Sequence, residues 1–230
     1  MRVVLIEHTP NPDKVIAYAA SQCYSEGFAG DSYNDASNPV NVEGIIKHVI
    51  KCGHTSTLEH SSFTFGIQGI SRSCANQLTR FRVASFSQQS QRYVKFEEAF
   101  EFVTPSAVAK SPLLQEYFDF MEYSYNMYIK LINNGILAED ARYVLPNACQ
   151  TNIVMTMNAR EMHHAANLRC CSRAQWEIQN LFREMIKLVK GVAPITFAKA
   201  GATCEAKGFC PEGNKSCGKL NKVIDSDKQA

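Results

Sequence analysis

Two long segments of the chain repeat apolar residues at intervals of three and four. The first begins at Leu114, with apolar residues at positions 118, 121, 125, 128 and 132, and the second has them at 178, 181, 185, 188 and 192. This spacing places them on one side of an α-helix, facing a hydrophobic core. Gly135 ends the first segment, and Gly191 and Pro194 end the second. The sequence therefore predicts a fold dominated by helices.

Shorter segments predict the remaining elements. Residues 1–8 and 151–159 have the composition of strands, and in residues 61–70 Phe63, Phe65 and Ile67 alternate with smaller or polar residues. Helices are expected at residues 11–24, 41–54 and 70–79, and a surface loop at the turn-rich segment 28–39. We predict an α+β fold, with one helix-rich domain over residues 1–200 and a small antiparallel sheet. Residues 201–230 form a Cys/Gly/Lys-rich tail.

Composition excludes several classes of protein. The chain has 230 residues, 45% hydrophobic and 20% charged, with a net charge of +2. A charge this small argues against binding nucleic acid through bulk electrostatics. No apolar run is long enough to span a membrane, and the start turns polar too soon for a signal peptide. We expect a cytoplasmic protein with neither a nucleic-acid nor a membrane partner.

The nine cysteines are expected to be reduced thiols. Those before residue 200 lack the spacing of metal ligands and are interpreted as small buried hydrophobic residues. In the tail, Cys204, Cys210 and Cys217 stand in a Gly/Lys-rich segment, where a metal, a redox role or no role remain open. Because tight Cys-x-x-Cys pairs and a fourth ligand are missing, no metal is predicted.

The stretch RFRVASFSQQSQRYV, residues 80–94, places three arginines among serines and glutamines without an acidic residue. Gln77 and Arg80 are three residues apart and are expected to share a helix face. The Ser/Gln-rich residues 85–91 favour a hydrogen-bonding loop. Since the arginine fork matches phosphate or a planar acceptor, this stretch predicts an anion-binding site.

Two further clusters contain polar side chains. In GHTSTLEH, residues 53–60, His54, Glu59 and His60 do not have the spacing of a zinc-binding His-Glu-x-x-His helix. Residues 141–179 are rich in planar donors, namely Arg142, Asn158, Arg160, His163, His164, Asn167 and Arg169.

The order of these motifs resembles the flavin-dependent thymidylate synthases. Gly-His-x4-Glu-His is followed by Gln-x2-Arg-x-Arg-x7-Ser-x-Arg-Tyr and then by Asn-Ala-Arg-x8-Arg, from about Gly53 to Gln179. The family signature is Arg-His-Arg, seven residues and Ser, and here a phenylalanine, Phe81, replaces the central histidine. The resemblance implies a homotetramer with active sites between subunits. It also implies binding of FAD, dUMP, methylenetetrahydrofolate and NADPH as reductant.

The resemblance also implies roles for individual residues. FAD would be contacted by Ser56, Arg80, Phe81, Arg82, Gln88, Asn158, Arg160 and His164. The nucleotide dUMP would be held by Gln77, Leu78, Thr79, Arg80, Gln88, Gln89, Ser90, Gln91, Arg92, Arg142 and Arg169. Arg169 would face the uracil ring and stabilise its negative charge as C5 becomes nucleophilic, and His54 would lie near the folate side of the flavin.

The reaction implied is reductive methylation of dUMP to dTMP, with reduced FAD as the hydride donor. The chain has no Gly-x-Gly-x-x-Gly motif and no Walker loop, so side chains are expected to hold the flavin. One alternative is a non-catalytic nucleotide- or RNA-binding module, in which Phe81 stands in place of the signature histidine because catalytic activity has been lost. Another is a flavoprotein of the same fold that acts on a different substrate.

Overall fold

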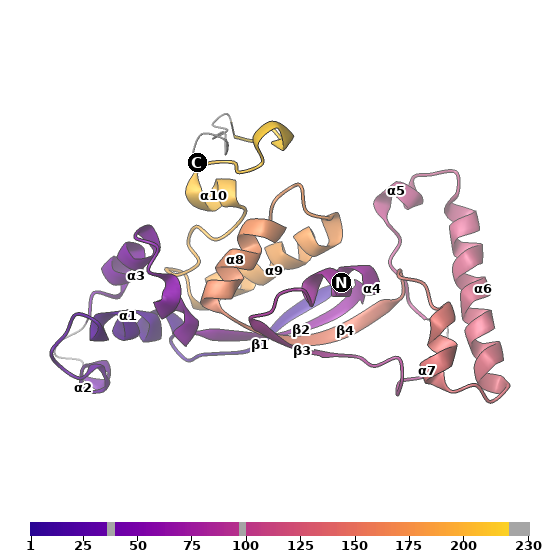
Figure 1. The fold of residues 1–230 in the computed structure, drawn as a ribbon, viewed down its shortest axis with the longest axis horizontal. Helices are drawn as coiled ribbons and strands as arrows, with labels where there is room; N and C mark the ends of the chain where they lie inside the picture. Colours follow the sequence, from indigo (N-terminus) through magenta and orange to yellow (C-terminus); the bar gives the residue numbers. More distant parts are fainter. Residues whose placement is uncertain (36–39, 97–99, 221–230) are drawn as a thin grey trace. The chain divides into compact units, whose positions relative to one another are not determined.

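The computed structural model describes residues 1–35, 40–96 and 100–220 (Figure 1). Its strands are β1 (Arg2–His8), β2 (Ser62–Ser71), β3 (Ala84–Gln88) and β4 (Gln150–Asn158). They form one antiparallel sheet in the order β1-β2-β4-β3. The predicted α+β class with a small antiparallel sheet is confirmed, and so are the three strands expected from the sequence.

The chain divides into two compact units. The first comprises Met1–Arg2, Gly66–Arg80 and the described residues of Phe86–Val154. The second comprises the described residues of Val3–Phe65, then Phe81–Ser85, and the described residues from Met155 onward. Strands β2 and β4 each contribute residues to both units. The predicted division between residues 1–200 and 201–230 follows a different boundary and stays a prediction.

The first unit contains α4 (Arg72–Leu78), α5 (Ser106–Ala109), α6 (Leu114–Asn133), α7 (Ala138–Ala141) and the 3-10 turn η2 (Arg142–Val144). Helix α6 spans the predicted segment, and Gly135 follows it with a positive φ of 82°. Met121 and Tyr128 of α6 are buried as expected. Phe118 is 39% exposed, and its ring contacts that of Phe102 at 5.8 Å.

The second unit contains α1 (Pro12–Gln22), α2 (Ala29–Asn34), α3 (Val42–Lys51), η1 (Thr55–His60), α8 (Ala159–Arg169), α9 (Trp176–Val192), α10 (Thr203–Lys207) and η3 (Gly213–Lys215). Ile178, Leu181 and Met185 of α9 are fully buried, which confirms the helix predicted from their spacing. Helices α8 and α9 pack side by side (Figure 1). The Asp13 carboxylate accepts hydrogen bonds from the backbone N–H groups of Ile195 and Thr196, joining α1 to the segment after α9.

The surface loop predicted at residues 28–39 is wrong for its first half. Residues Ala29–Asn34 form helix α2, while residues 36–39 lie outside the described part of the chain. Lys14 of α1 donates to the carbonyl of Tyr33 at 2.7 Å, and its ammonium lies 4.0 Å from the Tyr33 ring centroid. A contact between helices thus stabilises a turn-rich segment as a helix, which local sequence preference does not show.

Two expectations around the arginine-rich stretch are also wrong. Helix α4 ends at Leu78, and the Thr79 hydroxyl donates to the carbonyl of Ala75, so Arg80 lies beyond the helix and does not share a helix face with Gln77. Ala84–Gln88 form strand β3 rather than a loop. The reason is tertiary, because β3 pairs with β4 and the backbone continues that pairing with Gln89 N–H donating to the carbonyl of Asn152.

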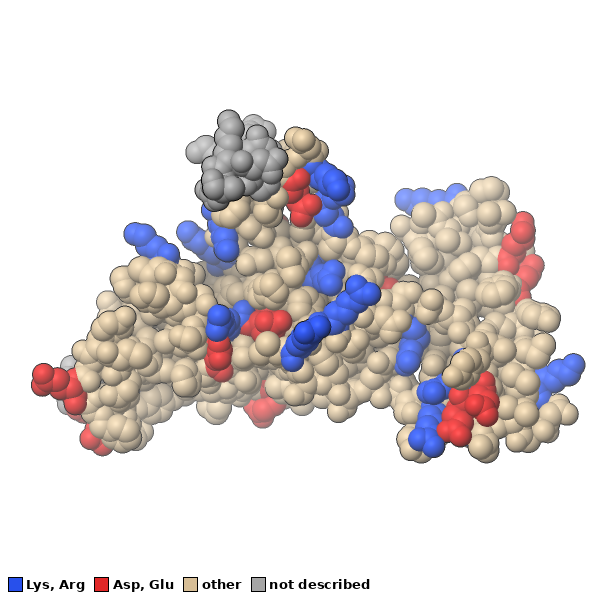
Figure 2. All heavy atoms as spheres, in the orientation of Figure 1, with Lys and Arg blue, Asp and Glu red and all other residues tan. Residues whose placement is uncertain are grey.

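Charged side chains are dispersed over the face of the protein drawn in Figure 2. On this face, Lys and Arg lie singly or in small groups among Asp, Glu and uncharged residues, in keeping with the net charge of +2. Within the described ranges, no helix is both long and apolar enough to cross a membrane. Part of the tail is folded, because α10 packs against α8 and Cys210 is buried.

Candidate functional site

The arginine-rich stretch crosses the boundary between the two units, since Arg80 belongs to the first and Phe81–Ser85 to the second. The residues expected to bind the nucleotide lie in the first unit, apart from Arg169. Those expected to bind flavin lie mostly in the second unit.

Strand β3 and the turn after it place the amide side chains of the first unit. The Gln88 side-chain amide donates to the Thr151 hydroxyl at 3.3 Å, and the Gln89 side-chain oxygen accepts from the Asn152 side-chain amide at 3.1 Å. Gln91 donates to the thiol sulfur of Cys149 at 3.8 Å. Residues of β4 and the segment before it thus orient three of the predicted side chains.

A turn at Ser90 leads from these amides to Arg92. The Ser90 hydroxyl accepts from the Arg92 backbone N–H at 3.2 Å, and the Ser90 carbonyl accepts from Val94 N–H at 3.0 Å. Ser90 is therefore held by its own turn, in keeping with a role as a ligand donor rather than an activated nucleophile.

Glu139 of α7 joins two of the predicted arginines. Its carboxylate lies 2.5 Å from Nε of Arg92, and its backbone carbonyl accepts from Nε of Arg142 at 2.9 Å. The sequence analysis did not identify Glu139, which is distant in sequence from the arginine-rich stretch. Glu139 thus holds Arg92 through its carboxylate and Arg142 through its backbone carbonyl, and the carboxylate competes with any anion that binds Arg92.

Arg72 at the start of α4 was also missed. Burial lowers the pKa of its guanidinium; the nearby Cys149 thiol opposes this shift and Arg142 adds to it. Arginine remains charged under these conditions. Arg72 therefore adds a positive charge near Arg142, while Glu139 and its neighbour Asp140 contribute negative charge from α7.

Other predicted nucleotide residues are less available. Leu78 is fully buried, so only its backbone could reach a ligand, and the Thr79 hydroxyl is engaged with Ala75. Gln77 is half-buried and Arg80 is exposed.

Cys74, Cys149 and Cys170 are buried as expected, whereas the expectation of burial is wrong for Cys23 and Cys52, which are exposed at or near the ends of helices α1 and α3, and Cys171 is half-buried. Burial raises the pKa of the Cys149 thiol to about 11. At neutral pH Cys149 is therefore a thiol rather than a nucleophilic thiolate.

In the second unit, η1 packs against α8 and brings two predicted segments together. His54 and Ser56 are exposed on and beside η1, and Glu59 of η1 forms an ion pair with Arg160 of α8. Asn158 caps α8, because its side-chain oxygen accepts from Glu161 N–H at 2.9 Å. The exposed pair stabilises the fold by at most about 1 kcal/mol, so Arg160 can change partner at little cost.

A second group in this unit surrounds Phe81. The guanidinium of Arg169 lies over the Phe81 ring at 5.4 Å from its centroid, and the exposed His164 meets the ring edge to face at 6.4 Å. Nε of Arg169 is buried and has no hydrogen-bond partner within the described part of the chain. A buried donor of this kind is costly unless a ligand accepts from it. Arg82 is exposed and outside this group.

The neighbouring histidine, His163, has a structural role. Its ring stacks on Phe197 at 4.9 Å, and its Nε2 lies 3.0 Å from the carbonyl oxygen of Thr196. Burial lowers the pKa of His163 to about 4. Of this pair, His164 is the more exposed to solvent.

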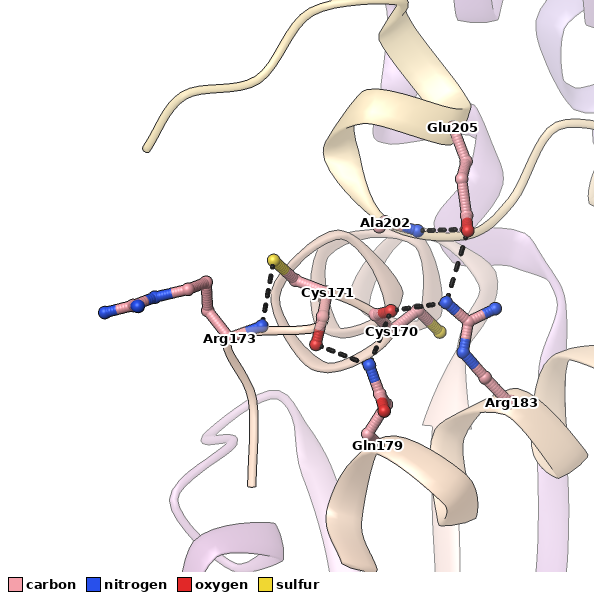
Figure 3. A network of polar contacts seen from close by, with 7 residues as sticks. All are labelled: Cys170, Cys171, Arg173, Gln179, Arg183, Ala202 and Glu205. Carbon is pink, nitrogen blue, oxygen red and sulfur yellow. Dashed lines mark hydrogen bonds and ion pairs between the residues drawn. The ribbon is translucent and has the colours of Figure 1, made fainter. Parts of the chain in front are cut away.

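A polar network fixes the chain just after Arg169 (Figure 3). Arg183 of α9 donates to the carbonyl of Cys170 at 2.7 Å and to the carboxylate of Glu205 at 3.2 Å. Gln179, one turn earlier on α9, donates to the carbonyls of Cys170 and Cys171. These bonds satisfy carbonyl groups at the end of α8 and so fix the position of Arg169. The spacing of Gln179 and Arg183 on one helix face is the sequence signal that could have suggested it.

Among the described residues, no group of three or more His, Cys, Asp or Glu side chains is arranged to hold a metal ion.

Comparison with known proteins places the chain in a family. A family model described as thymidylate synthase complementing protein, Thy1, matches residues 4–195. Flavin-dependent thymidylate synthase from Geobacter sulfurreducens is 47% identical over 97% of this chain and 96% of its own length. The proteins of the same name from Clostridium tetani and Pyrococcus horikoshii are 44% and 42% identical, over 97% and 92% of this chain and 95% and 90% of their own lengths. The chain therefore belongs to the Thy1 family, together with proteins named flavin-dependent thymidylate synthases.

Proposed function

We propose that the chain binds dUMP through the arginines and amides of its first unit and FAD through the polar side chains around η1 and α8. The enzyme converts dUMP to dTMP by reductive methylation, as its family membership and the names of its relatives support. The observation that carries the assignment of roles is the buried Nε of Arg169, for which the described residues supply no hydrogen-bond partner.

The arginines of the first unit would hold the phosphate of dUMP. Arg92 and Arg142 are already gathered by Glu139, and Arg72 adds positive charge beside them. A phosphate accepts charge-assisted hydrogen bonds from guanidinium groups and would replace Glu139 as the partner of Arg92. Gln88, Gln89, Ser90 and Gln91 would add neutral donors and acceptors for the pyrimidine and sugar.

The residues present also fit FAD. Exposed donors at His54, Ser56, Arg82 and His164 can turn toward a ligand, and Arg82 has the planar fork that suits a diphosphate. Arg80, Gln88, Asn158 and Arg160 complete the set of side chains that we assign to flavin. When bound and reduced, the flavin supplies a hydride.

The chain's own residues supply position and charge. Arg169 would place a fixed positive charge at the uracil ring, where negative charge develops as C5 attacks the one-carbon unit. His54 would lie toward the folate. Methylenetetrahydrofolate is the proposed carbon donor and NADPH the proposed reductant.

We also propose a homotetramer in the cytoplasm. The reaction needs flavin and nucleotide in contact, and an assembly with sites between subunits could supply residues from more than one chain. None of the nine cysteines forms a disulfide, which fits a reducing compartment. Size-exclusion chromatography with light scattering would test the tetramer.

The experiment that tests the function starts with the absorption spectrum of the purified protein. We expect a yellow protein with bound FAD, which releases tritium from C5-labelled dUMP only when NADPH and methylenetetrahydrofolate are present. A colourless protein that binds RNA with steep salt dependence would instead support the non-catalytic alternative. A yellow protein that does not bind dUMP would support a flavoprotein with another substrate.

A further inference from the structure

The contact between Phe81 and Arg169 joins residues that are far apart in the sequence. Phe81 is 7% exposed, and the Arg169 guanidinium lies 5.4 Å from the centroid of its ring. An aromatic face attracts a guanidinium without hydrogen bonding to it. The N–H groups in the guanidinium plane are then left for a planar acceptor, and one of them, at Nε, is buried without a partner among the described residues.

The Phe81 ring is itself held in place. Phe182 of α9 is fully buried and packs against it with centroids 5.5 Å apart and planes at 62°. His164 of α8 meets it at 6.4 Å and 87°. Because close-packed aromatic rings resist displacement, Phe81 presents a fixed surface on which Arg169 can rest.

The backbone near Arg169 is fixed independently. Arg183 and Gln179 of α9 donate to the carbonyl of Cys170, the residue that follows Arg169 (Figure 3). The network thus fixes where the Arg169 side chain begins, and the Phe81 ring fixes where its guanidinium lies. Neither contact supplies a negative charge to the guanidinium itself.

We propose that Phe81 is a positioning residue that acts through Arg169, holding its guanidinium by an aromatic face rather than by ring nitrogens. The proposal rests on the function proposed above for Arg169. It explains how a phenylalanine can stand where the family signature has histidine, since both rings offer a flat face and only the nitrogens are lost. On this view Phe81 supports the charge at the uracil ring and is not needed to hold the flavin.

The test compares two replacements of Phe81. Phe81→Leu keeps an apolar side chain and removes the aromatic face, so kcat for tritium release should fall about tenfold, equivalent to about 1.4 kcal/mol. A loss of this size is what one cation–π contact can account for. FAD content and the Kd for dUMP should change less than about threefold, because Arg169 acts mainly on the charge that develops during the reaction. Phe81→His keeps a flat ring and should keep kcat within about threefold of the unmodified protein, since at neutral pH most of an ordinary imidazole is uncharged.

A matched control separates positioning from packing. Phe63→Leu makes the same change at a fully buried phenylalanine of β2 in the same unit. It should lower the melting temperature without changing kcat. If Phe63→Leu lowers kcat as much as Phe81→Leu does, the effect is a general loss of packing and the proposal is overturned.

A second readout does not depend on activity. In flavin-free protein labelled with ¹⁵N-arginine, the Nε–H signal of Arg169, assigned by its loss in Arg169→Lys, should carry a ring-current shift. Phe81→Leu should remove this shift and Phe81→His should retain part of it. An unchanged signal in Phe81→Leu, or a hundredfold gain in kcat in Phe81→His, would overturn the proposal even though the enzyme makes thymidylate. Failure of the unmodified protein to bind dUMP would instead reject the proposed function. The ring-current shift would still show whether the Phe81 ring contacts the Arg169 guanidinium.

Discussion

The arginines assigned to the nucleotide and the arginine assigned to the uracil ring are held in different ways. In the first unit Arg92 lies 2.5 Å from the carboxylate of Glu139. In the second unit Arg169 rests on the Phe81 ring, and its buried Nε has no partner among the residues that the structure describes. A carboxylate offsets the charge that it holds, whereas an aromatic face leaves that charge in place. The first arrangement suits a site that exchanges partners on binding, and the second suits stabilisation of charge that develops during reaction.

The largest effect should come from removing the Arg169 charge. Arg169→Ala should lower kcat about 100-fold or more, as loss of one donor to developing charge commonly does. The Kd for dUMP should rise only a few fold, because the interaction strengthens in the transition state. Tritium release and equilibrium titration measure the two quantities, with Arg169→Lys as the variant that keeps the charge. Equal effects of Arg169→Ala on kcat and on Kd would make Arg169 an ordinary binding residue and remove the contrast.

Arg92 should behave in the opposite way. Arg92→Ala should weaken dUMP binding by about 1.5 to 3 kcal/mol, the usual value of a hydrogen bond to a charged group, with a smaller effect on kcat at saturating nucleotide. Titration calorimetry gives the affinity. Lys130→Ala, at an exposed basic residue of α6 in the same unit, serves as control and should leave the affinity unchanged. An unaltered Kd in Arg92→Ala would exclude this residue from the phosphate site.

Acid should destabilise the second unit through His163. Burial lowers its pKa to about 4 in the folded protein, below the value of about 6.5 expected in the unfolded chain. The unfolded chain therefore takes up the proton first as pH falls, and stability decreases between about pH 6.5 and pH 4 and then levels off. Between pH 7 and pH 5 the histidine should account for about 2 kcal/mol of lost unfolding free energy.

Denaturant unfolding of the protein and of His163→Gln at both pH values measures this difference. The variant should lose less stability on acidification, whatever its stability at pH 7. The same pH sensitivity in both proteins would show that other groups cause it.

The smallest expected effect concerns Glu139, whose removal would make the two regions more alike. Glu139→Gln takes away the carboxylate that competes with phosphate for Arg92, so dUMP should bind more tightly, by at most about 1 kcal/mol for an exposed ion pair. Asp140→Asn, at the adjacent carboxylate of α7, is the matched control for loss of one negative charge. Weaker binding in Glu139→Gln would mean that the carboxylate orders Arg92 more than it competes for it.

Local patterns predicted most of the helices and the central strands. The apolar spacing of α6 and α9 depends only on helix geometry, so the sequence was sufficient to find both. Polar segments were harder to assign. The Ser/Gln-rich residues of β3 became a strand because β4 lies beside them, and residues 29–34 became a helix with Lys14 bound at their carbonyl end. In each case the deciding partner comes from another part of the chain.

The sequence by itself determined the family, because the spacing of the motifs from Gly53 to Gln179 can be recognised without knowledge of the fold. It also identified Arg92, Arg142 and Arg169 as candidates, through the resemblance of the motifs around them to those of the family. Only the tertiary structure paired Arg92 with Glu139 and placed Arg169 on Phe81. The physical reason is that whether a guanidinium is neutralised by an acid or supported by an aromatic ring depends on contacts between residues far apart in the chain. Spacing along the sequence carries no record of those contacts.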